Sequence, residues 1–192
     1  MDTIPTPWIV LGTILVVALL VAAAWVLSQK KKRSQRLQQR FGPEYGRTVD
    51  ALGGRGKAES ELEAREKRVE HLTIKTLAPS EAARFSQAWS TLQGRFVDDP
   101  KGAVVQADQL VRELMLARGY PMGDFERRSA DISVDHPGVV KSYRAAQAIA
   151  VRDQRGEANT EELRKAVVHY RALFDELLEI RETKQPGGSI AA

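Results

Sequence analysis

The stretch that decides the fold runs from Trp8 to Leu27 and reads WIVLGTILVVALLVAAAWVL. It contains no charged residue, and as a helix rising 1.5 Å per residue it would be about 30 Å long, the thickness of a bilayer's hydrocarbon core. Trp8 and Trp25 lie near its two ends, where aromatic rings favour the membrane interface. The sequence therefore predicts a transmembrane helix at residues 8–28, preceded by a short extracytoplasmic tail at residues 1–7.

Basic residues follow the apolar run at once, with no acidic residue among them: Lys30, Lys31, Lys32, Arg33, Arg36 and Arg40. By the positive-inside rule, this charge places the C-terminal body in the cytoplasm and the first residues outside. A cleaved signal peptide is the competing interpretation, because Ala22-Ala23-Ala24 offers a small-residue cleavage site. However, no Lys or Arg precedes the apolar run, as such a peptide requires. We expect a single-pass protein whose six basic residues lie at the membrane surface and attract anionic headgroups.

The composition excludes several classes of function. The chain of 192 residues has a net charge of +4, and the excess of positive charge belongs to the short basic segment, so we expect no nucleic-acid binding. It contains no cysteine, which excludes disulfides, thiolate metal sites and cysteine nucleophiles. No phosphate-binding loop and no nucleophile motif is present. We therefore expect no metal, no cofactor and no enzymatic activity.

The remaining sequence predicts an all-α fold. Residues 29–78 form a basic juxtamembrane segment and a charged helical linker, whose narrow apolar stripe comprises Ala58, Leu62, Val69 and Leu72. Residues 79–183 form a bundle of about four helices, and residues 184–192 form a flexible tail. In the first bundle helix the apolar positions step by three and four residues: Ala82, Phe85, Trp89, Leu92 and Phe96. Asp99-Pro100 and His136-Pro137 mark helix starts, and Asn159 with Glu162 resembles a capping box.

Candidate partner-binding residues gather in the turn-rich stretch between the second and third long helices of the bundle: Arg118, Tyr120, Asp124, Phe125, Arg128, Asp135 and His136. Tyr, Phe and Arg are enriched at protein interfaces, and loops between rigid helices often carry binding residues. The competing interpretation is that the two aromatic rings plug the end of the bundle while Arg–Asp pairs brace the turn.

The favoured function is a membrane-anchored adaptor or scaffold that presents a cytoplasmic bundle to a protein partner, with homo-oligomers also compatible with the sequence. The alternative is a sensor that binds a small apolar ligand or lipid in a pocket between helices, lined by Trp89, Tyr143, Tyr170 and Phe174. An enzyme that uses Asp131, Asp135 and His136 is the least favoured reading, because no motif joins these residues into a convergent set.

Four phrases of the sequence carry a family resemblance: Arg40-Phe41-Gly42-Pro43-Glu44-Tyr45, Arg95-Phe96-Val97-Asp98-Asp99-Pro100, Arg118-Gly119-Tyr120-Pro121 and Ser133-Val134-Asp135-His136-Pro137. Together they resemble an uncharacterised family of small bacterial proteins that have one N-terminal span and a helical C-terminal domain. The resemblance covers nearly the whole chain and implies a bacterial inner-membrane protein. It implies no reaction, ligand or catalytic residue.

Overall fold

The computed structural model describes residues 6–178, and the regular secondary structure of this part of the chain is all helical, with no strand. Its helices are α1 (Thr6–Phe41), α2 (Pro43–Leu52), α3 (Arg55–Glu70), α4 (Pro79–Arg95), α5 (Pro100–Arg118), α6 (Phe125–Asp135), α7 (Pro137–Gln154) and α8 (Thr160–Leu178). The all-α prediction is confirmed for this part. The predicted end of the bundle at residue 183 and the predicted flexible tail at 184–192 lie outside the described residues, as do residues 1–5.

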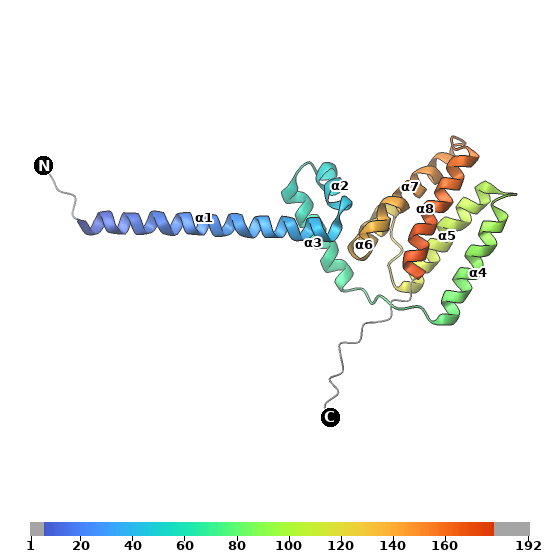
Figure 1. Ribbon diagram of the computed structural model, residues 1–192, viewed down its shortest axis with the longest axis horizontal. Coiled ribbons are helices and arrows are strands. Elements are labelled where there is room, and N and C mark those ends of the chain that lie inside the picture. Colours follow the sequence, from blue (N-terminus) through green and yellow to red (C-terminus); the bar gives the residue numbers. More distant parts are fainter. Residues whose placement is uncertain (1–5, 179–192) are drawn as a thin grey trace, which may run out of the picture.

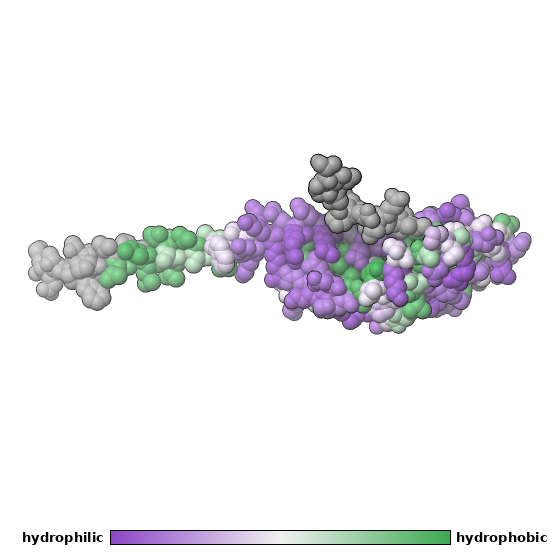
Figure 2. Space-filling model, turned by 90° about the horizontal axis from the view of Figure 1, so that it is seen from below, coloured by the Kyte–Doolittle hydropathy of each residue, from purple (hydrophilic) through white to green (hydrophobic). Residues whose placement is uncertain are grey.

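Helix α1 is a single uninterrupted helix of 36 residues, about 54 Å long at 1.5 Å per residue. It projects from the other helices (Figure 1), and the described large apolar side chains between Leu11 and Leu27 are exposed. Figure 2 shows this apolar part as a hydrophobic rod that joins a hydrophilic region near the rest of the chain. Leu20 and Leu27, for example, are 65% and 66% exposed. Helix α1 is therefore long and apolar enough to be a membrane span or a signal sequence.

The main core joins α4, α5, α7 and α8, which lie together at the end of the molecule remote from α1 (Figure 1). Of the apolar positions predicted for the first bundle helix, Ala82, Phe85, Trp89 and Leu92 are buried there and Phe96 is partly buried. Helix α5 buries six apolar side chains in the same core: Val104, Ala107, Leu110, Val111, Leu114 and Met115. Trp89 of α4 stacks on Phe174 of α8, with ring centroids 4.5 Å apart. The short helix α6 packs against α7 and connects this bundle to α3.

A second core lies between the end of α1 and helices α2, α3 and α6, and its buried apolar residues are Leu37, Phe41, Tyr45, Leu62, Val69 and Val134. Residues 29–78, which the sequence predicted as a basic juxtamembrane segment and a charged helical linker, thus contribute most of the buried residues of this core. Leu37 and Phe41 are both 0% exposed, so the C-terminal part of α1 belongs to the folded domain. The sequence did not predict this packing of α1, because isolated apolar residues within a strongly basic segment show no apolar face of their own until a partner helix covers them.

Local signals fix the helix ends where the sequence placed them. Asp99 accepts a hydrogen bond from the backbone N–H of Gly102 at 2.9 Å, and Asn159 and Glu162 form a reciprocal capping box with two bonds of 2.9 Å. Gly119 ends α5 with φ +95°, and a Cβ there would lie 2.4 Å from the carbonyl oxygen of Thr73. Glycine at this position thus lets the segment between α3 and α4 cross the end of α5.

A buried carboxylate holds three helices together. Glu44 of α2 is only 5% exposed, and it accepts hydrogen bonds from Arg65 of α3 at 3.5 Å and from Arg144 of α7 at 3.0 Å. Arg47, one turn further along α2, lies 3.4 Å from the same oxygen. Because guanidinium groups surround the carboxylate, its burial is compensated by charge, and the second core is tied to the bundle.

We expect Phe41→Ala to lower the free energy of unfolding by about 3–5 kcal/mol, because it removes a buried aromatic ring from the second core. Gln39→Ala, at an exposed position of the same helix, should change it by less than about 0.5 kcal/mol. Denaturant unfolding of the full-length protein in detergent, followed by circular dichroism, measures both. Equal effects of the two substitutions would show that α1 does not pack in the domain.

We expect Glu44→Ala to destabilise the domain by about 3 kcal/mol or more, because it leaves the partly buried guanidinium groups of Arg65 and Arg144 without their shared counter-charge. Glu61→Ala is the matched control, since it removes a more exposed carboxylate from Arg65 and should cost about 0.3–0.5 kcal/mol. The same denaturant unfolding compares the two variants, and similar losses would contradict the role given to Glu44.

Candidate functional site

Three arginines of α1 face three glutamates of α3 along the junction of the two helices, and we call this set the arginine ladder: Arg33, Arg36 and Arg40 with Glu59, Glu63 and Glu66. The Nε of Arg33 lies 2.8 Å from Glu63, and Arg36 and Arg40 lie 3.1 and 3.3 Å from Glu66. The arginines are spaced by three and four residues and the glutamates by four and three, so each set lies along one helix face.

The ladder divides the six residues that the sequence placed at the membrane surface. Lys30, Lys31 and Lys32 are exposed and lie nearer to the apolar run, where anionic headgroups would be. Arg33, Arg36 and Arg40 instead contribute to the packing of α1 against α3. The six basic residues after the apolar run thus form two groups: three exposed lysines, and three arginines that pair with glutamates of α3.

Glu59 of the ladder is buried and links a third helix to it. It accepts hydrogen bonds from the hydroxyl of Tyr45 in α2, at 2.9 Å, and from the hydroxyl of Ser34 in α1. Burial of the Tyr45 ring raises the pKa of its hydroxyl, and donation to Glu59 raises it further. Tyr45 is therefore held as a neutral donor between the helices.

Asp131 of α6 is a second buried carboxylate that faces α3. Its Oδ1 accepts two hydrogen bonds from the guanidinium of Arg68, at 3.2 and 3.3 Å, and its Oδ2 lies 3.7 Å from Arg127. This contact fixes α6 against α3 and so positions Val134, Asp135 and His136 at the end of α6.

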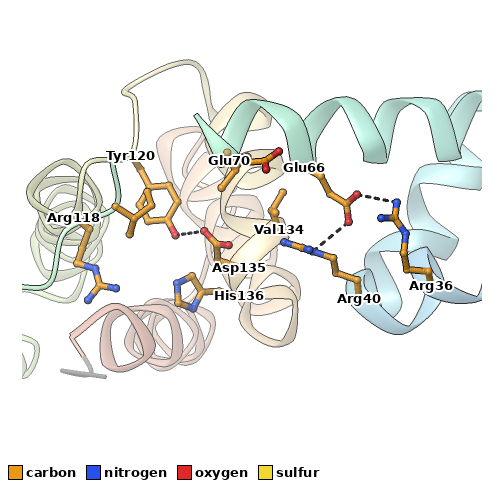
Figure 3. Close-up of a pocket in the computed structure, with 11 residues that line it drawn as sticks. Arg36, Arg40, Glu66, Glu70, Arg118, Tyr120, Val134, Asp135 and His136 are labelled. Atoms are coloured by element: carbon orange, nitrogen blue, oxygen red, sulfur yellow. Dashed lines mark hydrogen bonds and ion pairs between the residues drawn. The ribbon is translucent and has the colours of Figure 1, made fainter. Parts of the chain in front are cut away.

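A pocket of about 800 Å³ lies where these elements meet. We call it the stalk pocket, because one wall is the end of α1 (Figure 3). Its lining comes from α1, α3, the segment after α3, the end of α5 and the end of α6: Arg36, Arg40, Glu66, Val69, Glu70, Ile74, Arg118, Tyr120, Val134, Asp135 and His136. The pocket thus lies between the second core and the bundle and draws on residues a hundred positions apart in the sequence.

Polar groups in the stalk pocket are oriented by neighbours. The hydroxyl of Tyr120 donates to Oδ2 of Asp135 at 2.9 Å, as Figure 3 shows, and Nδ1 of His136 lies 2.9 Å from Oε1 of Glu176 in α8. Val69, Ile74 and Val134 supply an apolar wall beside them. A pocket that combines fixed carboxylates, guanidinium groups, a tyrosine and an apolar wall suits the mixed chemistry of a polypeptide segment.

The structure brings together four of the seven predicted partner-binding residues. Arg118, Tyr120, Asp135 and His136 line the stalk pocket. It also adds Arg36 and Arg40, which the sequence had assigned to the membrane surface. The contribution of α3 was missed, although the spacing of Glu59, Glu63 and Glu66 matches that of the three arginines and was a signal for the pairing.

The other three predicted residues have separate structural roles away from the stalk pocket. Asp124 accepts a hydrogen bond from the backbone N–H of Arg127 at 2.8 Å and caps α6. The ring of Phe125 packs on Tyr143, with centroids 4.9 Å apart. Arg128 donates to the hydroxyl of Tyr143 at 3.3 Å. For these residues the competing interpretation, in which they brace the end of the bundle, describes the geometry.

The aromatic residues proposed to line a ligand pocket lie packed in the main core. Trp89, Tyr143, Tyr170 and Phe174 are at most 2% exposed. Trp89 stacks on Phe174, and Tyr143 meets Tyr170 edge to face with centroids 6.2 Å apart. Burial raises the pKa of both tyrosines. These rings therefore contribute to the packing of the main core, and none of them lines the stalk pocket.

The residues of the enzyme hypothesis each have a different partner. Asp131 pairs with Arg68, Asp135 accepts from Tyr120, and His136 contacts Glu176. Within residues 6–178, no group of three or more His, Asp or Glu side chains is arranged to hold a metal ion. These three side chains thus act in separate contacts between helices.

No protein-family model matches the chain, and neither do the curated proteins or the solved structures with which it was compared. The resemblance carried by the four sequence phrases therefore stays an expectation. What the protein does has to follow from the projecting α1, the arginine ladder and the stalk pocket.

Proposed function

We propose that the protein is a single-pass protein of the bacterial inner membrane whose cytoplasmic helical domain binds a protein partner at the stalk pocket. The observation that carries the proposal is the continuity of α1: one helix bears the exposed apolar run and also buries Leu37 and Phe41 in the second core. An anchor and a binding domain are thus parts of one rigid unit.

The features of α1 support membrane insertion with the N-terminus outside. The described large apolar side chains between Leu11 and Leu27 are exposed, and burial in a bilayer would remove them from water. Lys30, Lys31 and Lys32 follow directly, which favours a cytoplasmic location for everything after them. These lysines then meet the headgroups, while the arginine ladder stays with the domain.

The continuity of α1 also sets the distance between the stalk pocket and the end of the apolar run, and so the height of the pocket above the membrane. Arg36 and Arg40 follow Leu27 by 9 and 13 residues, so along a helix they lie about 14 and 20 Å beyond the apolar run. A partner at this height is itself at the membrane surface, such as the juxtamembrane segment of another membrane protein. Arg36 and Arg40, whose side chains are 58% and 48% exposed, belong to a residue type that anchors such interfaces.

The orientation can be tested with single cysteines, because the natural chain has none. We expect Thr3→Cys to react with a membrane-impermeant maleimide in intact cells. Gly54→Cys, in the domain, should react only after the membrane is permeabilised. Labelling of Gly54→Cys but not of Thr3→Cys in intact cells would place the domain outside the membrane. Recovery of the Gly54→Cys protein in the soluble fraction after cell lysis would indicate that the apolar run is a cleaved signal sequence.

The partner site can be tested by placing a photo-cross-linking amino acid at Glu70, an exposed residue that lines the stalk pocket. We expect irradiation of intact cells to give a discrete adduct between the full-length protein and a second protein. Gln87, exposed on α4 and outside the pocket lining, is the matched control and should give none. Equal adducts at both positions, or no adduct at Glu70, would contradict the proposal.

A further inference from the structure

A second pocket, with a volume of about 340 Å³, lies where α2 contacts α7, and we call it the α2–α7 pocket. Its lining shares no residue with the stalk pocket: Pro43, Glu44, Arg47, Pro137, Lys141 and Arg144. Three of these side chains are cationic and one is anionic. The pocket thus has the size of a small-molecule site and a lining with an excess of positive charge.

The one carboxylate of this lining is already surrounded by cations. Glu44 is buried, and its Oε1 lies 3.4 Å from Arg47 and 3.0 Å from Arg144. Arg65 approaches the same oxygen from α3, at 3.5 Å. Lys141 is exposed and forms no ion pair with any residue in the described range 6–178. Glu44 therefore leaves most of the positive charge around the pocket available to a second anion.

The side chain of Glu126 shows that these arginines accept a second oxyanion. Glu126 belongs to the first turn of α6 and lies outside the pocket lining. Its Oε2 lies 2.7 Å from Arg144 and 3.6 Å from Arg47, so the two guanidinium groups contact both Glu44 and Glu126. Because the Glu126 side chain is 68% exposed, its ion pairs contribute little in water and a ligand anion displaces it at small cost.

The charge and the walls of the pocket favour a phosphate monoester. Such a group carries a charge of about −1.5 to −2 at pH 7, which matches the excess of two positive charges in the lining. Guanidinium groups bind phosphate oxygens through paired hydrogen bonds. Pro43 and Pro137 add apolar ring surface against which the organic part of the ligand packs. Each proline also begins a helix, and the dipoles of α2 and α7 add positive potential at the same place.

We propose that the α2–α7 pocket binds a small soluble phosphate monoester, whose phosphate contacts Arg47, Lys141 and Arg144 in place of Glu126. This site is separate from the partner site of the proposed function, since the two pockets share no lining residue.

The distance from the apolar run favours a soluble ligand over a lipid headgroup, and this step rests on the proposed membrane orientation. Phe41, the last residue of α1, follows Leu27 by 14 residues, which is about 21 Å along a helix. Pro43 comes two residues later, so the pocket lies near this height. The headgroup layer on one side of a bilayer is only about 5–8 Å thick. A phosphate that belongs to the bilayer would therefore not reach the pocket.

Binding is tested by calorimetric titration of the full-length protein, in an uncharged detergent, with phenyl phosphate as the probe. We expect saturable binding that Lys141→Ala weakens about tenfold, because the variant removes one cation from the phosphate site. Lys57→Ala is the matched control, since it removes an exposed lysine of α3 outside the pocket lining and should leave the affinity unchanged. Absence of saturable binding, or equal affinities of the two variants, would overturn the site.

The displacement of Glu126 is tested by the same titration. Glu126→Gln should bind phenyl phosphate several-fold more tightly than the unaltered protein, because no carboxylate then competes for Arg47 and Arg144. Glu161→Gln removes an exposed carboxylate of α8 that pairs with Arg164, so it makes the same change in net charge away from the pocket. Equal affinities of these two variants would overturn the exchange of Glu126 for the ligand.

The source of the phosphate is tested by repeating the titration in nanodiscs of zwitterionic or anionic phospholipid. At about 0.15 M salt the Debye length is about 8 Å, so surface charge has little effect at the height of the pocket. We expect affinities equal within about twofold in the two bilayers. Weaker binding in the anionic nanodiscs alone would show that lipid headgroups occupy the pocket and would overturn the soluble ligand. These titrations contain no protein partner, so their result and that of the Glu70 photo-cross-link are independent.

Discussion

Burial of Leu37 and Phe41 is the contact on which the rest of the arrangement depends. Both side chains are fully removed from water, which contributes about 1.5–3 kcal/mol each, and both belong to the helix that carries the exposed apolar run. Because α1 is continuous, this contact fixes its direction relative to α2, α3 and α6. The stalk pocket exists only because α1 is held there, since its arginines form one wall.

The charged residues around this contact add little to the stability of the domain. Their main effect is to favour one arrangement of the helices over others. Exposed ion pairs such as Arg36 with Glu66 contribute little in water, because solvent screens them. Glu59 and Asp131 are different, since a buried carboxylate without its donors would be costly. Each accepts hydrogen bonds from residues on other helices, so any packing that separates these helices is penalised.

The sequence was sufficient for a helix whose apolar face repeats along its length, as in α4, where Ala82, Phe85, Trp89 and Leu92 are buried as predicted, because a 3.6-residue period is a local property. It was insufficient for the second core, where Leu37 and Phe41 stand among basic residues and acquire a buried face only when α3 covers them. The stalk pocket was not predicted for the same reason. No local sequence pattern marks its residues, and only the contact of α3 with α6 brings Glu66 and His136 to one site.

The continuity of α1 has a consequence for the proposed membrane anchor that a flexible linker would not have. A flexible chain lets a tethered domain search a volume that grows with linker length, whereas a continuous helix would hold the pocket at one height above the bilayer. Under the proposed function, partners would then be selected by where their binding segment lies relative to the membrane as well as by its chemistry. Arg36 and Arg40 contact Glu66 of α3 and also line the pocket. Under the proposed function, an occupant that draws these arginines toward itself would compete for them with Glu66, a residue through which they contact α3.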